Sequence, residues 1–299
     1  MQFKNLTMSF GTQTIFEDVN LNIPDNVKIG VVGVNGAGKT TLFKLLMVLE
    51  FADTGKIITK NGYRIDWLPQ VISDDVDNMN MEVLEYLMQA RPIKKLNIEL
   101  QTLYESLANT NSNQNEIFNK IEKVQKQLDY WDSYNTLFKI IDGVKLSDDI
   151  LLKKLNELSG GQKSKVAFVK LLYSNPEIIL LDEPTNHLDE ESKKYIINYL
   201  KNYKGTVLII SHDVDFLDQV TTKTLFLDKR TKSFSLYDGN YSYFKRVQKE
   251  RDENLLRQAQ IQQQEEEKLR EIINKYSSAS GNKKRMKLRF IYIPHGMFY

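Results

Sequence analysis

The sequence contains no cysteine, which excludes disulfide bonds and thiolate metal sites and indicates a reducing compartment. No apolar run approaches the roughly 20 residues that a membrane-spanning helix needs, and the N-terminal "MQFKNLTMSF" lacks the apolar core of a signal peptide. Neither charge dominates, since the sequence has 41 Lys and Arg residues and 39 Asp and Glu residues. Binding to nucleic acid would therefore have to depend on local patches of positive charge. These absences predict a soluble cytoplasmic protein.

What is present is enough apolar sequence, 41% of 299 residues, for one large core or two modest ones. Residues 1–70 alternate short β-branched runs with turns, which favours strands, whereas "KTTLFKLLMVLE" (39–50) has the spacing of a helix. Strand character returns at 177–181 and 206–210. A strand, a glycine-rich turn and a helix in succession predict an α/β unit with parallel strands.

A helical segment interrupts this α/β pattern. From about 71 to 157 apolar residues recur at intervals of three and four, which indicates amphipathic helices, and the polar "ANTNSNQN" (108–115) predicts a loop between two of them. After about 245 the chain reads as a charged helix that breaks at "SSASGN" (277–282). It is followed by "KKRMKLR" (283–289), in which five of seven residues are basic.

The stretch "GVNGAGKT" (33–40) fits the pattern G-x-x-x-x-G-K-[ST], with an apolar strand before it and a helix after it. Such a loop points its backbone N–H groups at phosphate oxygens, and the helix N-terminus adds a positive dipole end. Lys39 would reach the β- and γ-phosphates, and the Thr40 hydroxyl would bind Mg²⁺. The alternative is a glycine turn without ligand. The predicted nucleotide-binding residues of this loop are Gly33, Asn35, Gly36, Ala37, Gly38, Lys39, Thr40 and Thr41.

Two adjacent carboxylates end the apolar run "EIILLDEP". Ligands of open α/β sheets bind at the carboxyl ends of strands, and two carboxylates there are costly without a cation or water. We therefore expect Asp182 to hold Mg²⁺, and Glu183 to orient or deprotonate the water that attacks the γ-phosphate. The alternative is a solvated acidic turn.

Five motifs together resemble the ATP-binding cassette family over residues 1–245: "GVNGAGKT", "WLPQ", "LSGGQ" (158–162), "IILLDEP" and "ISHD". The resemblance implies a P-loop NTPase core with a mixed sheet, and a helical signature and arm subdomain over about 71–165. It gives Gln70 a role beside Mg²⁺ and the water, and His212 a hydrogen bond to the γ-phosphate. The signature residues that would cap another subunit's ATP are Ser159, Gly160, Gly161 and Gln162.

Phe10 lies 23 residues before the phosphate loop, where the family places an aromatic ring on adenine. The alternative for Phe10 is an ordinary core side chain.

Within the family, "EPTNHLD", "SHDVDFLD" and "YDGNYSYF" resemble the soluble ABC-F branch, whose members act on ribosomes. One departure is Val214, where that branch often has Arg. The segment 246–299 resembles the start of that branch's basic interdomain linker, which implies contact with ribosomal RNA in the complete protein. A merely solvated charged helix is the alternative. Antibiotic resistance, translation-factor activity and ribosome assembly all fit the resemblance.

Only one set of cassette motifs is present, although the family's ATP sites are composite. The resemblance therefore implies a second cassette as partner, in a homodimer or in a missing C-terminal half. The final "FIYIPHGMFY" breaks the charged pattern and looks like a truncated or frameshifted product or a deliberate fragment.

The sequence thus predicts an ATPase that converts ATP and water to ADP and phosphate. Two alternatives stay open: a nucleotide-binding subunit of a membrane transporter, and a chain that binds ATP and RNA without turnover alone.

Overall fold

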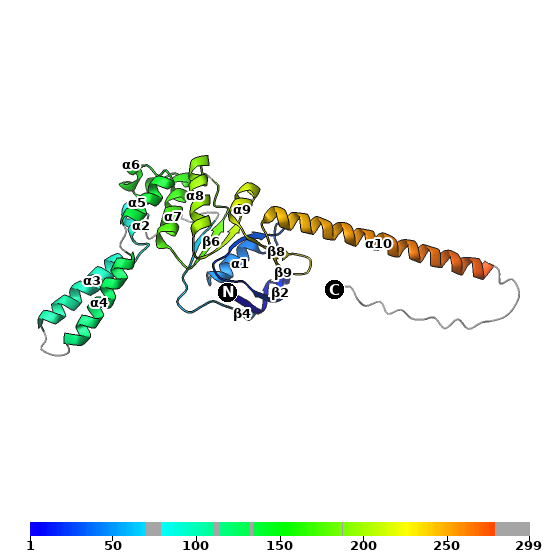
Figure 1. The fold of residues 1–299 in the computed structure, drawn as a ribbon, viewed down its shortest axis with the longest axis horizontal. Coiled ribbons are helices and arrows are strands. Elements are labelled where there is room, and N and C mark those ends of the chain that lie inside the picture. The colour runs from blue at the N-terminus through cyan, green and yellow to red at the C-terminus, as the bar shows by residue number, and fades with distance from the viewer. Residues whose placement is uncertain (70–78, 110–113, 132–133, 187, 279–299) are drawn as a thin grey trace. The chain divides into compact units, whose positions relative to one another are not determined.

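The computed structural model describes residues 1–69, 79–109, 114–131, 134–186 and 188–278 (Figure 1). Gln70, the basic segment 283–289 and the C-terminal ten residues lie outside this set. The chain divides into two units, Met1–Phe244 and Lys245–Tyr299.

Two sheets make up the β structure. The first is antiparallel with the order β2-β1-β4, and the second has the order β5-β6-β7-β3-β8-β9. In the second sheet every pair is parallel except β8 and β9, so the sheet is mixed, as the resemblance implies. The strands are β1 Gln2–Phe10, β2 Gln13–Asn22, β3 Lys28–Val32, β4 Thr54–Ile58, β5 Ile65–Leu68, β6 Ile178–Asp182, β7 Thr206–Ile210, β8 Lys223–Asp228 and β9 Ser233–Asp238.

Strand β6 shows why the central strands are apolar throughout. Its side chains alternate between two hydrophobic clusters, with Ile178 and Leu180 in one and Ile179 and Leu181 in the other. Successive side chains of a strand point to opposite faces, so a strand covered on both faces needs apolar residues at every position. All residues of β6 are buried, as this requires.

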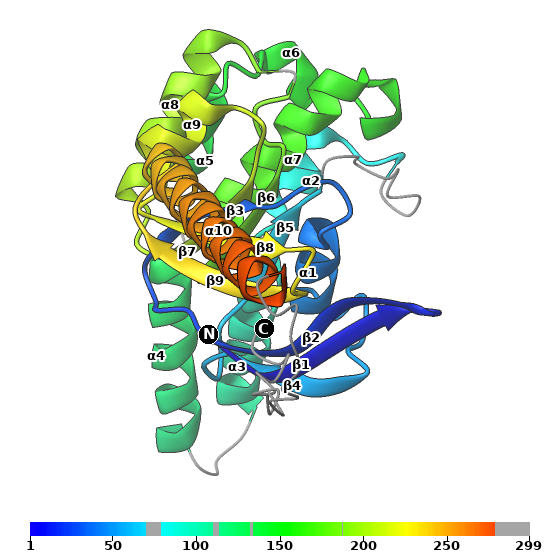
Figure 2. The ribbon, with the colours of Figure 1, turned by 90° about the vertical axis from the view of Figure 1, so that its right-hand side faces the viewer.

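The phosphate-loop helix α1 (Lys39–Leu46) lies between the two sheets (Figure 2). Its buried Leu42 and Phe43 join the cluster that also contains Phe3 of β1 and Leu208 of β7. The helix is shorter than the 39–50 predicted from sequence. It ends because Val48 takes a left-handed conformation, with φ 58°, and turns the chain away.

Helices cover the other face of the six-stranded sheet, where α7, α8 and α9 share a hydrophobic cluster with β6 and β7. The predicted helical insert is present, and α3 and α4 pack together as an extended hairpin (Figure 1). The helices are α2 Val83–Met88, α3 Ile93–Asn109, α4 Gln114–Trp131, α5 Tyr134–Gly143, α6 Asp148–Leu151, α7 Gly160–Ser174, α8 Glu190–Asn202 and α9 Val214–Val220, with the short 3-10 helix η1 Leu155–Glu157 before α7.

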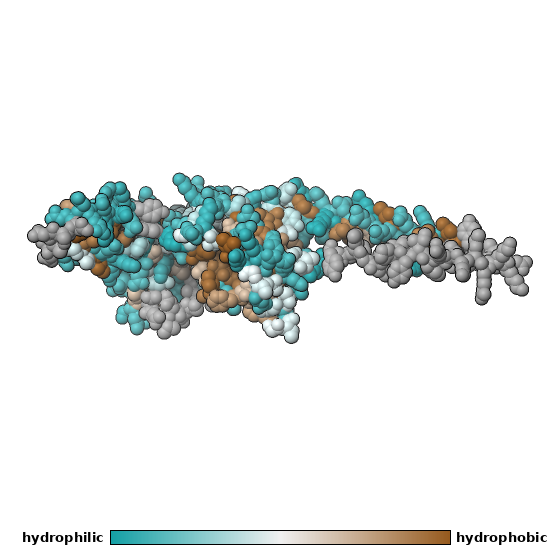
Figure 3. Space-filling view, turned by 90° about the horizontal axis from the view of Figure 1, so that it is seen from below, coloured by the Kyte–Doolittle hydropathy of each residue, from teal (hydrophilic) through white to brown (hydrophobic). Residues whose placement is uncertain are grey.

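The last helix, α10 (Tyr241–Ser278), begins five residues before the charged segment expected from sequence. It starts early because Phe244 is buried against Phe226 and Tyr237 of the first unit. The surface in Figure 3 is largely hydrophilic, with hydrophobic residues gathered near its middle. Within the described ranges, none of the helices has both the length and the apolar character to cross a membrane.

Candidate nucleotide-binding site

Three adjacent parallel strands, β6, β7 and β3, end at the same edge of the six-stranded sheet. The loops that leave them carry the phosphate loop after β3, the acid pair at the end of β6, and His212 after β7. Parallel strands bring their carboxyl ends together, so motifs about 140 and 170 residues apart in sequence meet here. The sheet topology alone therefore gathers the predicted site.

The phosphate loop keeps a tight curl. Gly38 has φ 92°, and a Cβ atom there would lie 2.5 Å from the ring of Phe16, so only glycine fits. The Lys39 ammonium donates a hydrogen bond to the Gly33 carbonyl at 2.9 Å and thus spans the loop. Burial lowers the pKa of Lys39 below its usual value, while Asp182 and Glu183 oppose that shift. The loop thus holds the partly desolvated Lys39 ammonium group against its own backbone.

The metal-binding prediction concerns Asp182, which is the last residue of β6 and only 4% exposed. The Thr40 hydroxyl donates to its Oδ2 atom at 3.2 Å, so the structure brings together two of the three residues predicted to bind Mg²⁺. Burial raises the pKa of Asp182, and the Thr40 hydrogen bond and Lys39 offset this only in part. A carboxylate in this state gains from any cation that reaches it.

Glu183 has the most unusual environment in the site. It is 8% exposed and left-handed at φ 52°, a conformation its N–H maintains by donating to the Ile210 carbonyl at 2.8 Å. Its Oε2 atom accepts the His212 N–H at 3.2 Å. Its Oε1 atom is buried without a hydrogen-bond partner among the described residues, and its contact with the His212 ring nitrogen is long, at 3.5 Å. This oxygen therefore keeps an unused capacity to accept a hydrogen bond.

The acid pair and Thr40 suit Mg²⁺, which usually binds through one or two protein oxygens together with substrate phosphates. No group of three or more His, Asp or Glu side chains that could hold a metal is found in the described parts of the chain.

The other predicted residues differ in how the structure places them. The His212 side chain is 80% exposed and reaches Glu183 from the turn between β7 and α9. Phe10, at the end of β1, is 47% exposed, so the alternative of a core side chain is wrong. In the loop, Ala37 is buried, whereas Asn35 and Gly36 are exposed and Thr41 is half-buried.

The signature residues form the N-terminus of α7, with Ser159 as its N-cap. The Ser159 hydroxyl accepts the Gln162 N–H at 3.3 Å, and the Gln162 side chain accepts the Ser159 N–H at 2.9 Å. This capping box explains a Ser and a Gln three residues apart. Gly160 is exposed, and a Cβ atom added there would meet no described atom within 4 Å, whereas Gly161 is half-buried. In the described residues no hydrogen bond joins this group to the phosphate loop.

Sequence reasoning missed two lysines beside this site. Lys165 of α7 binds Asp189 at 2.8 Å, and Lys193 of α8 binds Asp213 at 2.5 Å. Both aspartates are helix N-caps, and an Asp before an apolar-periodic run is a readable signal. The lysine partners lie 24 and 20 residues away and carry no local signal.

The family model described as ABC transporter matches residues 16–186, more than half of the chain, and a second model with the same description matches residues 228–289. Among solved structures, a dimeric bacterial ABC transporter cassette superimposes with a TM-score of 0.52 at 20% identity, covering 79% of this chain and 97% of that one. The likeness supports the cassette fold.

Two relatives show how the chain compares with longer proteins. The uncharacterized ABC transporter ATP-binding protein YfmR of Bacillus subtilis is 34% identical over 84% of this chain and 39% of its own length. The energy-dependent translational throttle protein EttA of Haemophilus influenzae is 32% identical over 83% of this chain and 45% of its own. The chain thus spans less than half the length of either, and its relatives include members of the ABC-F branch.

Proposed function

The chain belongs to the ABC transporter family, and from this premise we propose that it is the ATP-hydrolysing cassette of an ABC-F-type protein that acts on the ribosome in translation. The observation that carries the hydrolytic part is the Oε1 atom of Glu183, a buried carboxylate oxygen without a hydrogen-bond partner among the described residues. It lies beside the phosphate loop and next to the Asp182–Thr40 pair. A general base needs such an oxygen available to its water.

Each residue then has a distinct task. The loop amides and Lys39 bind the phosphates, and Phe10 stacks on the adenine. The side chains of Thr40 and Asp182, with Gln70, would hold Mg²⁺, whose charge would neutralise that of the phosphates. Glu183 takes a proton from water as that water attacks the γ-phosphorus, which releases ADP and phosphate. His212 stabilises the γ-phosphate from its exposed position.

A second cassette completes the site in this proposal. The capping box of Ser159 and Gln162 leaves the N-terminal end of α7 facing solvent, where it is accessible to another cassette's ATP. The dimeric state of a solved cassette with this fold supports such an arrangement. The partner is a second copy or the other half of a longer protein.

Action on the ribosome is supported by a relative's name and by the basic segment, and not by the geometry of the nucleotide site. A relative that is named for translational throttling matches most of this chain. The segment 246–299 carries the basic cluster 283–289, whose side chains would neutralise RNA phosphates. The complete protein's partners are part of the proposal, because the chain spans less than half of such relatives.

The test is the ATPase rate at increasing protein concentration, with and without ribosomes. We expect specific activity to rise with concentration and on addition of ribosomes. In Glu183→Gln an ATP-bound dimer should persist on a sizing column, and adding Ser159→Arg should dissolve it. Flat specific activity from nanomolar to tens of micromolar, with monomeric elution throughout, would contradict the composite site.

The basic cluster has its own test. Replacement of Lys283, Lys284, Arg285, Lys287 and Arg289 by Gln should flatten the salt dependence of ribosome binding, by up to about 0.7 to 0.9 log units per lost phosphate contact. ATP affinity should not change. An unchanged salt slope would assign this segment to a solvated helix.

A nucleotide-binding subunit of a transporter is the second candidate, since the matching family models and the solved cassette carry transporter descriptions. Copurification with a membrane partner, without sedimentation with ribosomes, would favour it.

A further inference from the structure

Two ion pairs link α7, α8 and α9, the three helices that cover one face of the six-stranded sheet. Lys165 of α7 reaches Asp189, the N-cap of α8, and Lys193 of α8 reaches Asp213, the N-cap of α9. In each case a lysine from one helix binds the residue that begins the next. The series starts in the signature helix and ends one residue after His212.

The Lys193–Asp213 pair is the tighter and less exposed of the two. The two side chains are 19% and 25% exposed and their charged atoms are 2.5 Å apart. Asp213 also accepts the Phe216 N–H at 3.0 Å, which starts α9, and its own N–H donates to the Ser211 hydroxyl at 3.1 Å. Partly buried, charge-assisted hydrogen bonds of this kind hold geometry better than exposed pairs do.

This turn determines where His212 lies. Its backbone N–H donates to Glu183 Oε2 at 3.2 Å, so a shift of the turn would release one of the two carboxylate oxygens of Glu183. Displacement of a catalytic group by about 1 Å can lower a rate by roughly a hundredfold. Lys193 itself projects from α8 and contacts Asp213 rather than any predicted ligand of ATP.

We propose that Lys193 is a positioning residue for ATP hydrolysis, which fixes the Ser211–Asp213 turn and through it the contact between His212 and Glu183. The inference rests on the proposed function, since it assigns Lys193 to the same hydrolytic site. The side chain acts through Asp213 and not on ATP. Its loss should therefore lower turnover and leave nucleotide affinity unchanged.

The variant is Lys193→Met, which keeps the aliphatic stem and removes the charge. Its matched control is Lys194→Met, because Lys194 is the exposed neighbour on α8 and forms no ion pair with the described residues. With saturating Mg-ATP, at a concentration where the wild type turns over, kcat should fall roughly ten- to a hundredfold. The dissociation constant for ATP should stay within about twofold, Lys193→Arg should restore most of kcat, and the control should match the wild type.

A second readout needs no turnover. Amide hydrogen exchange at His212 and Phe216 should become at least about fivefold faster in Lys193→Met, while strand β6 keeps its protection. Asp213→Asn retains a capping oxygen but loses the charge, and it should give the same pattern even if Lys193→Met folds poorly.

The outcomes separate the two proposals. If the wild type shows no turnover under any condition, the proposed function is refuted. Hydrogen exchange would then still show whether Lys193 fixes the Ser211–Asp213 turn. Exchange and kcat equal to those of Lys194→Met would overturn the inference. So would a uniform loss of protection and stability that Lys193→Arg does not repair, since that result indicates a merely structural role.

Discussion

Strand β6 is flanked by two glutamates, Glu177 before it and Glu183 after it, which differ in their hydrogen-bond partners. Glu177, at the amino edge of the sheet, accepts the Arg64 N–H at 2.8 Å and lies 3.4 Å from the Arg64 Nε atom. Burial alone would raise the pKa of Glu177, but the Arg64 contacts hold it below its usual value. Glu183, at the carboxyl edge, keeps a buried oxygen without a hydrogen-bond partner among the described residues.

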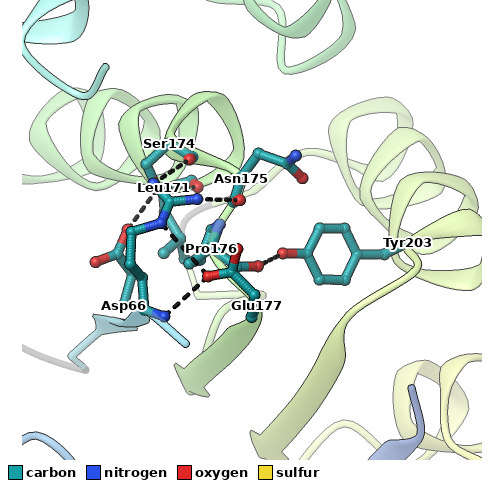
Figure 4. A network of polar contacts seen from close by, with 8 residues as sticks. Asp66, Leu171, Ser174, Asn175, Pro176, Glu177 and Tyr203 are labelled. Carbon is teal, nitrogen blue, oxygen red and sulfur yellow. Dashed lines mark hydrogen bonds and ion pairs between the residues drawn. The ribbon is translucent and has the colours of Figure 1, made fainter. Parts of the chain in front are cut away.

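The rest of the amino edge follows the same rule. The Arg64 side chain also donates to the carbonyls of Ser174 and Asn175 at the end of α7, and the Tyr203 hydroxyl bonds the Pro176 carbonyl. Ser174 in turn donates to Asp66 (Figure 4). The two glutamates therefore differ: the protein itself supplies hydrogen-bond partners for Glu177, whereas one oxygen of Glu183 has none among the described residues.

The largest effect should come from Glu183→Gln, which tests whether the open oxygen is a base. Turnover should fall by about a hundred- to ten-thousandfold, because an amide cannot take the proton from water. ATP binding should persist, as measured by equilibrium titration. Asp182→Asn should instead weaken Mg²⁺-dependent binding, and an equal loss of ATP affinity in both variants would show that the two roles are assigned wrongly.

The sequence could predict this carboxyl edge because its parts are local. A glycine loop between a strand and a helix, and an acid pair after an apolar run, are readable without the fold, and topology then brings Thr40 to Asp182. The amino edge was not predictable in this way. Arg64 and Glu177 are 113 residues apart, and a lone Arg or Glu carries no pattern. Nor does sequence indicate that Glu183 is left-handed, since that conformation depends on its bond to β7.

Arg64→Met should have the next largest effect, as a loss of stability rather than of activity. It removes two hydrogen bonds to backbone carbonyls and the contact with Glu177, which together contribute about 2 kcal/mol after allowance for the partial exposure of the pair. Urea denaturation would measure the loss. Arg230→Met, at an exposed arginine of the turn between β8 and β9, is the control and should change little. An equal effect in both variants would remove the distinction between the two edges.

Asp182→Asn should stabilise the nucleotide-free chain, by about 0.5 to 2 kcal/mol, as substitutions that relieve a functional site often do. Burial raises the pKa of Asp182, so its charged form is costly in the folded state. The gain should be fully present above the folded pKa and fade as the pH falls from that value to 3.8. Asp66→Ala is the control, and should destabilise the chain because it removes the oxygen that accepts a hydrogen bond from Ser174. Denaturation in urea at neutral and acidic pH would contradict this contrast if both variants shifted alike.

The smallest effects concern Asn175 and Val48, whose backbones are left-handed. Asn175 at the amino edge is left-handed at φ 47°, and Asn tolerates that region well, so Asn175→Gly should change stability by only a few tenths of a kcal/mol.

Val48, at the end of α1, is left-handed at φ 58°, which strains a β-branched residue by about 1 to 3 kcal/mol. Its side chain is exposed, so Val48→Gly removes little packing. Glycine also raises the entropy of the unfolded chain, which costs about 0.4 to 1 kcal/mol. We expect a net gain of about 1 kcal/mol, measured as a higher urea midpoint, with ATPase activity unchanged. A stability gain for Asn175→Gly as large as for Val48→Gly would mean that a left-handed Asn at the amino edge is strained as much as a left-handed Val at the end of α1.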